Sequence, residues 1–134
     1  MLLYSTLGTD NLPRAVVFYD AVFKVLGHSR VDDPTEGWAG WGKDYDNGYG
    51  FWLCPPFDGM PSTSGNGTMF AFRADSAEQV RAFHAAGLAN GGTDEGLSAV
   101  RDYYEPDFFV AYLRDPDGNK LAAVYHRYDP EADR

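Results

Sequence analysis

The stretch Asp115-Pro116-Asp117-Gly118-Asn119 lies between two apolar runs near the C-terminal end of the chain. Proline presets one backbone angle of a tight turn, and glycine readily supplies the positive φ that such a turn needs. The flanking runs, at about 108–114 and about 119–126, are short and rich in residues typical of strands. The sequence therefore predicts a β-hairpin at the end of the chain.

The residues before this hairpin predict a strand, a helix and a further strand. Residues 68–74 alternate between apolar and smaller or polar side chains, which is typical of a strand. Ser76 and Gln79 have the spacing of a capping box, and we expect the helix that follows to end at Gly87. After a glycine-rich connection, a short strand is predicted at about 97–101. The second half of the chain thus has the order strand, helix and three strands.

The first half of the chain predicts the same order. Residues 2–7 form a short apolar stretch that is typical of a strand. Asn11 is placed to cap a helix whose apolar residues recur at helical spacing, and Gly27 is placed to end it. Three further strands are then predicted, at about 28–32, about 37–42 and about 48–54. A duplicated βαβββ unit is the simplest description of the whole chain.

We expect one α+β domain over residues 1–134, made of two modules that share a core. The first module covers about 1–55 and the second about 67–126. The segment at about 56–66 is rich in Pro, Gly and Ser and is the predicted linker, and residues 127–134 form a tail. Neither module can bury both faces of its own sheet, so the two should pack together.

Composition limits the classes of partner. With 20 acidic and 11 basic residues the net charge is −9, which argues against nucleic acid and favours a cationic or neutral ligand. A single cysteine excludes an internal disulfide framework and a multi-cysteine zinc site. No apolar run approaches the roughly 20 residues of a membrane helix, and the first residues lack the features of a signal peptide. We therefore expect a cytoplasmic protein with no membrane partner.

Four segments, in this order and spacing, carry a resemblance to a known family. They are Leu7-Gly8 with the helix through Phe18-Tyr19-Asp20, then Gly65-Asn66-Gly67-Thr68-Met69-Phe70-Ala71-Phe72, then Gly91-Gly92-Thr93-Asp94-Glu95-Gly96, and finally residues 115–121. Through them the chain resembles the glyoxalase, bleomycin-resistance and extradiol-dioxygenase superfamily, also called vicinal oxygen chelate proteins, over about residues 2–126. The resemblance implies paired βαβββ modules that form a half-open barrel around a cup.

In enzymes of this family the cup holds a divalent metal ion, bound by His and Glu side chains on four strands. The resemblance places Tyr4, Trp52, Met69 and Ala122 at those four positions. A tyrosine binds such an ion only after losing a proton with a pKa of about 10, and methionine sulfur suits soft ions. We therefore expect neither a metal ion nor another cofactor at this site.

Strand alternation predicts which side chains line the cup. The predicted pocket residues are Tyr4, Thr6, Trp52, Met69, Ala71, Arg101, Tyr104, Ala122, Val124 and His126. The side chains of opposite parity, which should pack beneath the helices, are Leu3, Leu7, Phe51, Leu53, Phe70, Phe72 and Leu121. Such a lining suits an apolar or aromatic ligand. In the alternative, Trp52 and Met69 close the cup as core residues.

Polar side chains near the predicted cup leave several roles open. Arg101 can receive a carboxylate or phosphate of a ligand, or it can form an ion pair with Asp102 or Glu95. His126 should lie at the rim of the cup. His28 is expected at the surface and His84 on a partly exposed face of the second helix, so no catalytic residue is identified.

Three functions follow from these expectations. The first is a metal-independent protein that binds a small, partly aromatic organic molecule, as a homodimer like the bleomycin-resistance members of the family. The second is an enzyme without metal that uses Tyr4 or His126 as acid or base. The third is a metal-dependent glyoxalase-type lyase, isomerase or dioxygenase whose ligands lie elsewhere in the chain. The remaining alternative is a structural or regulatory partner with no chemistry of its own.

Overall fold

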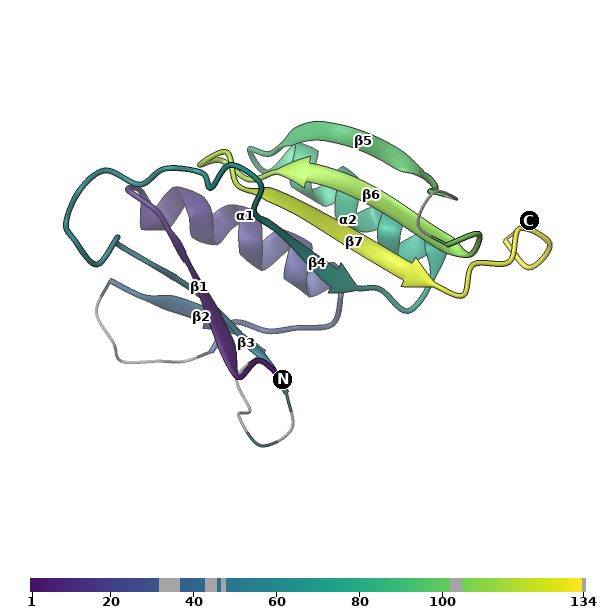
Figure 1. The fold of residues 1–134 in the computed structure, drawn as a ribbon, viewed down its shortest axis with the longest axis horizontal. Helices are drawn as coiled ribbons and strands as arrows, with labels where there is room; N and C mark the ends of the chain where they lie inside the picture. The colour runs from purple at the N-terminus through teal and green to yellow at the C-terminus, as the bar shows by residue number, and fades with distance from the viewer. Residues whose placement is uncertain (32–36, 43–45, 47, 102–104, 134) are drawn as a thin grey trace.

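The computed structural model of this chain describes residues 1–31, 37–42, 46, 48–101 and 105–133. Both halves of the chain begin with a strand and a helix and continue with further strands (Figure 1). The elements are β1 (Tyr4–Gly8), α1 (Leu12–Val25), β2 (Ala39–Trp41), β3 (Gly50–Cys54), β4 (Met69–Arg73), α2 (Ala77–Ala89), β5 (Thr93–Val100), β6 (Phe108–Arg114) and β7 (Lys120–His126). The α+β class and the paired modules expected from the sequence are confirmed.

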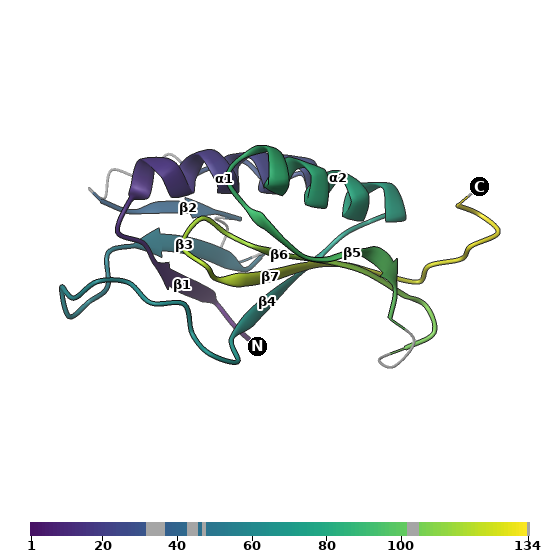
Figure 2. The same ribbon diagram turned by 90° about the horizontal axis from the view of Figure 1, so that it is seen from above.

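The strands form two sheets, with the order β1-β3-β2 in the first and β4-β7-β6-β5 in the second. Figure 2 shows that α1 and α2 lie along the same side of both sheets. The opposite side of the sheets is not covered by a helix, and we call it the cup face. Within the described part of the chain, no helix is long and apolar enough to cross a membrane.

The hydrophobic core lies between the helices and the sheets. Tyr19 and Phe23 of α1 contact Trp41 and Phe51 through ring-to-ring packing with centroids 5.0–5.7 Å apart. The side chains expected beneath the helices are buried (Phe51, Leu53, Leu121) or half-buried (Leu7, Phe70, Phe72) against this core. Leu3 is the exception, at 51% exposure. It precedes β1, so no helix covers it.

Side-chain caps begin both helices as predicted. Asn11 Oδ1 accepts a hydrogen bond from the Arg14 backbone N–H at 3.1 Å, and Ser76 Oγ accepts one from the Gln79 N–H at 3.1 Å. In α1, Gly27 takes a left-handed conformation with φ of +87° just beyond the helix end. Local sequence was therefore sufficient to place these boundaries.

The predicted end of α2 at Gly87 is wrong, because the helix continues to Ala89. A Cβ atom at Gly87 would lie 2.3 Å from Leu113 Cδ1, so glycine at this position allows α2 to approach β6 closely. The left-handed conformation beyond the helix belongs to Gly91, whose φ is +97°. Gly87 thus allows the close packing against β6, and Gly91 supplies the left-handed conformation that the sequence analysis assigned to Gly87.

Two strand predictions also need correction. Of the strand expected at about 28–32, the described residues show only an isolated bridge between Arg30 and Trp41; residues 32–36 lie outside the described part. The glycine-rich connection before residue 97 is itself strand, since β5 begins at Thr93. Register shifts on either side of Gly96 let this segment pair with β6 despite its glycine.

Candidate functional site

Small and apolar side chains from β4 and β7 lie side by side on the cup face of the second sheet. Ala71 pairs with Ala122 in the parallel β4–β7 ladder, and Val124 lies two residues farther along β7 on the same face. Ala122 is fully buried, whereas Met69 is 39% exposed at the start of β4. Four of the predicted pocket residues, Met69, Ala71, Ala122 and Val124, therefore share one face.

The middle of this face is formed by β6, a predicted strand that contributes none of the predicted pocket residues. Val110 and Tyr112 form a buried cluster with Ala122, and Phe108 and Val124 pack against it. A signal for these residues was present, because the predicted hairpin brings residues of β6 opposite those of β7. The observed pairs are Phe108–His126, Val110–Val124 and Tyr112–Ala122.

A cavity of about 580 Å³ opens at the end of this face. Its lining includes Ala71, Val124 and His126, together with Phe108 and Arg73. The His126 side chain is 60% exposed, and its Nε2 lies 3.7 Å from Asp107 Oδ1. Its ring meets Phe108 edge-on, with centroids 4.7 Å apart. His126 thus lies at the rim of the cavity.

The cup face of the first sheet has a different character. Thr6 pairs with Trp52, and the Trp52 ring lies against Gly40 on the next strand, where an added Cβ would be 2.4 Å from it. The edge of Trp38 covers this ring at a centroid distance of 6.3 Å. Trp52 is therefore buried, while Tyr4 at the start of β1 is exposed.

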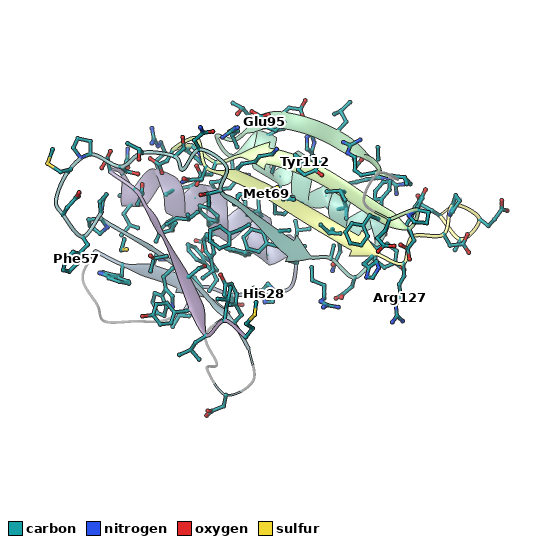
Figure 3. All side chains as sticks on the ribbon, viewed as in Figure 1. His28, Phe57, Met69, Glu95, Tyr112 and Arg127 are labelled. Carbon is teal, nitrogen blue, oxygen red and sulfur yellow. The ribbon has the colours of Figure 1, made fainter. Side chains whose placement is uncertain are left out.

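Two further hollows involve the predicted residues Thr6 and Met69. Thr6 lines a cavity of about 630 Å³ with Trp38, Cys54 and residues 55–58 and 61–63. Met69 lines another of about 510 Å³, together with Arg114, Lys120 and the segment Ser64–Thr68. The predicted residues that line these cavities are thus distributed among three openings of this single chain. Figure 3 shows Met69 and Tyr112 over the second sheet and Phe57 far from them.

Arg101 packs against an aromatic ring of the cup face. Its guanidinium carbon lies 5.4 Å from the centre of the Tyr112 ring, and its Nη2 donates a hydrogen bond to the Leu97 carbonyl at 2.6 Å. Glu95, one of its two expected ion-pair partners, contacts Arg114 at 2.8 Å instead. Asp102, the other, and the predicted pocket residue Tyr104 lie outside the described residues.

Of two further titratable groups, His84 lies outside the cup lining and the thiol of Cys54 is unreactive. His84 is buried and not partly exposed as expected, and its Nε2 lies 2.8 Å from Asp94 Oδ1 on the helix side of β5. This hydrogen bond and one from the Gly96 N–H hold the pKa of Asp94 below its ordinary value. Burial raises the pKa of the Cys54 thiol, so the thiol stays protonated and unreactive.

The family resemblance assigns four positions of the chain to the ligands of a divalent metal ion. They present a phenol, an indole, a thioether and a methyl group, from Tyr4, Trp52, Met69 and Ala122. The indole Nε1 of Trp52 is buried without a hydrogen-bond partner, and an indole N–H can only donate. No group of three His, Cys, Asp or Glu side chains suited to a metal ion is found among the described residues. This donor set does not fit a divalent metal ion.

Comparison with known proteins finds solved structures of similar fold. No family model and no curated protein sequence matches the chain. A glyoxalase/bleomycin resistance protein from Albidiferax ferrireducens T118 is 38% identical over 91% of this chain and 95% of its own, with a TM-score of 0.80. A glyoxalase/bleomycin resistance protein/dioxygenase family enzyme from Burkholderia phytofirmans PsJN is 19% identical over 94% and 99%, with a TM-score of 0.73. A lactoylglutathione lyase from Agrobacterium tumefaciens is 20% identical over 95% and 94%, with a TM-score of 0.63. The last two show a likeness of fold alone.

Proposed function

Because this chain belongs to the glyoxalase/bleomycin resistance protein family, we propose that it binds a small, partly aromatic organic molecule in its cup without the help of a metal ion. The observation that carries this proposal is the apolar lining of the second sheet beside an open cavity of about 580 Å³. Binding sites for small molecules are typically concave, largely apolar and of roughly 300–1,000 Å³. Ala71 and Val124 supply a flat floor, and Phe108 supplies an aromatic wall.

The proposed absence of a metal ion is supported by the chemistry of the side chains at the family's ligand positions. Met69 and Ala122 stand where the family resemblance implies His and Glu, and neither carries an oxygen or nitrogen donor. A thioether favours soft ions such as Cu(I) over the ions that His and carboxylate ligands select. Affinity must then come from burial of apolar surface and contact with aromatic rings.

We also propose that the protein acts as a homodimer. The predicted pocket residues are divided among several openings of the single chain. Large apolar side chains near them are exposed, among them Tyr4 and Met69. A second copy of the chain that covers these side chains would join the openings into one site. Light scattering coupled to size exclusion should therefore give twice the mass of the chain.

Binding is tested with the neutral, environment-sensitive dye N-phenylnaphthylamine. Ala71 is exposed on the cup face, so Ala71→Phe should fill the 580 Å³ cavity and abolish the dye's fluorescence increase. Ala85 is exposed on α2, and Ala85→Phe is the matched control that should leave binding intact. Equal binding by both variants would contradict the proposal.

A second measurement tests the proposed independence of metal. The untagged protein is incubated with Ni²⁺, Zn²⁺, Co²⁺, Mn²⁺ and Fe²⁺, desalted and analysed for bound elements. We expect far less than one ion per chain, and dye binding that a chelator does not change. Retention of one ion per chain would overturn the proposal and direct assays toward lyase and dioxygenase chemistry.

A further inference from the structure

We propose that the cup of this acidic protein holds an anionic group of its ligand, a carboxylate or a phosphate, near Lys120 and Arg101 beside the ring of Tyr112. The inference builds on the proposed function, because it names the class of molecule that the cup binds. It reverses the expectation from net charge, which favoured a cationic or neutral ligand.

The geometry centres on Tyr112, in the middle of the second sheet's cup face. The Lys120 Nζ lies 5.0 Å from the centre of its ring and the guanidinium carbon of Arg101 lies 5.4 Å from the same point. The two positive charges are therefore at most about 10 Å apart, close to the screening length of physiological salt. Each is attracted by the ring, but the two repel each other. An anion near both would relieve that repulsion.

No carboxylate among the described residues compensates these charges. The Lys120 side chain forms no ion pair or hydrogen bond there, and the side-chain hydrogen bond of Arg101 goes to the Leu97 carbonyl. Elsewhere among the described residues, three arginines form ion pairs with carboxylates, whereas Lys24 and Arg127 form none. These ion pairs are Arg14–Asp117, Arg30–Asp20 and Arg81–Asp133.

The same face carries further positive charge. Arg73 pairs with Val124 in the β4–β7 ladder and lines the 580 Å³ cavity, and it too has no carboxylate partner among the described residues. Arg114 also lies on this face, where Glu95 neutralises it at 2.8 Å. Beside Tyr112 the cup face of the second sheet thus carries two cations without a described carboxylate partner, although the net charge of the molecule is −9 and Asp75 also lines the 580 Å³ cavity. Charges within a few ångströms outweigh distant ones, because salt screens the latter.

Space for the anionic group lies on the Lys120 side of Tyr112, in a hollow whose lining does not include Arg101. The hollow of about 510 Å³ is bounded by Lys120, Arg114 and Met69 and by the polar segment Ser64–Thr68. The apolar strip of Ala71, Ala122 and Val124 continues from there along β4 and β7. A ligand with a charged head and an apolar body can therefore place the head near Lys120 and the body along this strip.

The test uses two dyes that share an aromatic frame and differ in charge, anilinonaphthalene sulfonate and the neutral N-phenylnaphthylamine. The wild type should bind the sulfonate more tightly, and Lys120→Gln should weaken that binding by about 5–10-fold while leaving the neutral dye within about 2-fold. Arg101→Gln should act in the same direction. The matched control is Lys24→Gln, which removes an exposed charge on α1 and should change neither affinity.

The outcomes separate the two proposals. If the neutral dye binds but the sulfonate has no advantage, or if Lys24→Gln weakens the sulfonate as much as Lys120→Gln, the anion site is overturned and the proposed function stands. If neither dye binds, both fall. Should Lys120→Gln fail to fold, dye binding by Arg101→Gln and a competition experiment with the wild type decide. Benzoate or phenylphosphate should displace the sulfonate dye, whereas benzamide should not. If none of these compounds displaces the dye, the inference is contradicted. Stronger displacement by one of the two acids identifies the group as carboxylate or phosphate.

Discussion

The Tyr19 hydroxyl donates a hydrogen bond to Asp115 Oδ2 at 2.6 Å and so joins the first helix to the last hairpin turn. Both side chains are buried, and Asp115 also accepts from the Asp117 N–H, the Asn119 N–H and the Asn119 side-chain amide at 2.9 Å each. Burial and the negative Asp115 raise the pKa of Tyr19 well above its ordinary value, so the hydroxyl stays a donor. Two segments that carry the family resemblance thus hold the modules together.

Tyr19→Phe should lower the free energy of unfolding by about 1–3 kcal/mol, because it removes a buried hydrogen bond to a charged acceptor. The control is Tyr49→Phe, since the Tyr49 hydroxyl is buried without a hydrogen-bond partner. Its removal should leave stability unchanged or slightly higher. Urea unfolding of both variants gives the comparison. A larger loss for Tyr49→Phe would contradict the role of the Tyr19–Asp115 bond.

Asp94 should contribute stability that depends on pH. The hydrogen bonds from His84 and the Gly96 N–H lower its pKa in the folded state below the ordinary 3.8. Its contribution is then fully present above pH 3.8 and is lost as the pH falls from 3.8 through the folded pKa. Urea unfolding of wild type and Asp94→Asn should therefore differ by a constant amount near neutral pH and by less below pH 3.8.

The control for this series is Glu105→Gln, which removes the same charge from an exposed side chain that forms no ion pair or side-chain hydrogen bond in the described part of the chain. Its difference from wild type should change little over the same range. A constant difference for Asp94→Asn down to the most acidic pH would show that Asp94 has no lowered pKa.

Gly40→Ala should displace the Trp52 ring, because the new Cβ would lie 2.4–2.6 Å from three of its atoms. Overpacking against a rigid buried ring typically costs about 1–3 kcal/mol. Trp52→Leu removes the clash, so the effects of Gly40→Ala and Trp52→Leu should be clearly non-additive in a double-mutant cycle. Additive losses would mean that the two residues do not pack as described.

Combining Tyr4→His, Met69→His and Ala122→Glu should create metal affinity. Ala122 is fully buried beside Val110 and Tyr112, so the new carboxylate destabilises the protein unless an ion neutralises it. Ni²⁺ or Zn²⁺ should therefore raise the Tm of the variant and remain bound after desalting. The control carries Ala132→Glu in the exposed tail instead. A folded variant without metal affinity would show that these are not the family's ligand positions.

Much of the fold follows from local signals. The hairpin at 115–119, the caps at Asn11 and Ser76 and the repeated order of elements depend on turn chemistry and periodicity within a few residues. The apolar parity of β3 and β7 likewise placed Phe51 and Leu121 in the core. The side-chain types at the positions that the resemblance assigns to metal ligands also follow directly from the sequence.

Other features depend on which distant residues meet, and those were misjudged or missed. The sequence predicts that the helix ends at Gly87, but in the structure this glycine allows α2 to pack closely against Leu113. His84 reads as partly exposed, yet it is buried against Asp94.

The sequence by itself determined the order of the elements, their turns and the side-chain types at the positions that the resemblance assigns to metal ligands, because local chemistry and residue identity decide these. The tertiary structure alone decided that Lys120 and Arg101, 19 positions apart in the chain, approach the same ring of Tyr112. Composition records that the chain is acidic. Only the pairing of β5, β6 and β7 concentrates unpaired positive charge on one face, because sheet register sets which side chains lie together.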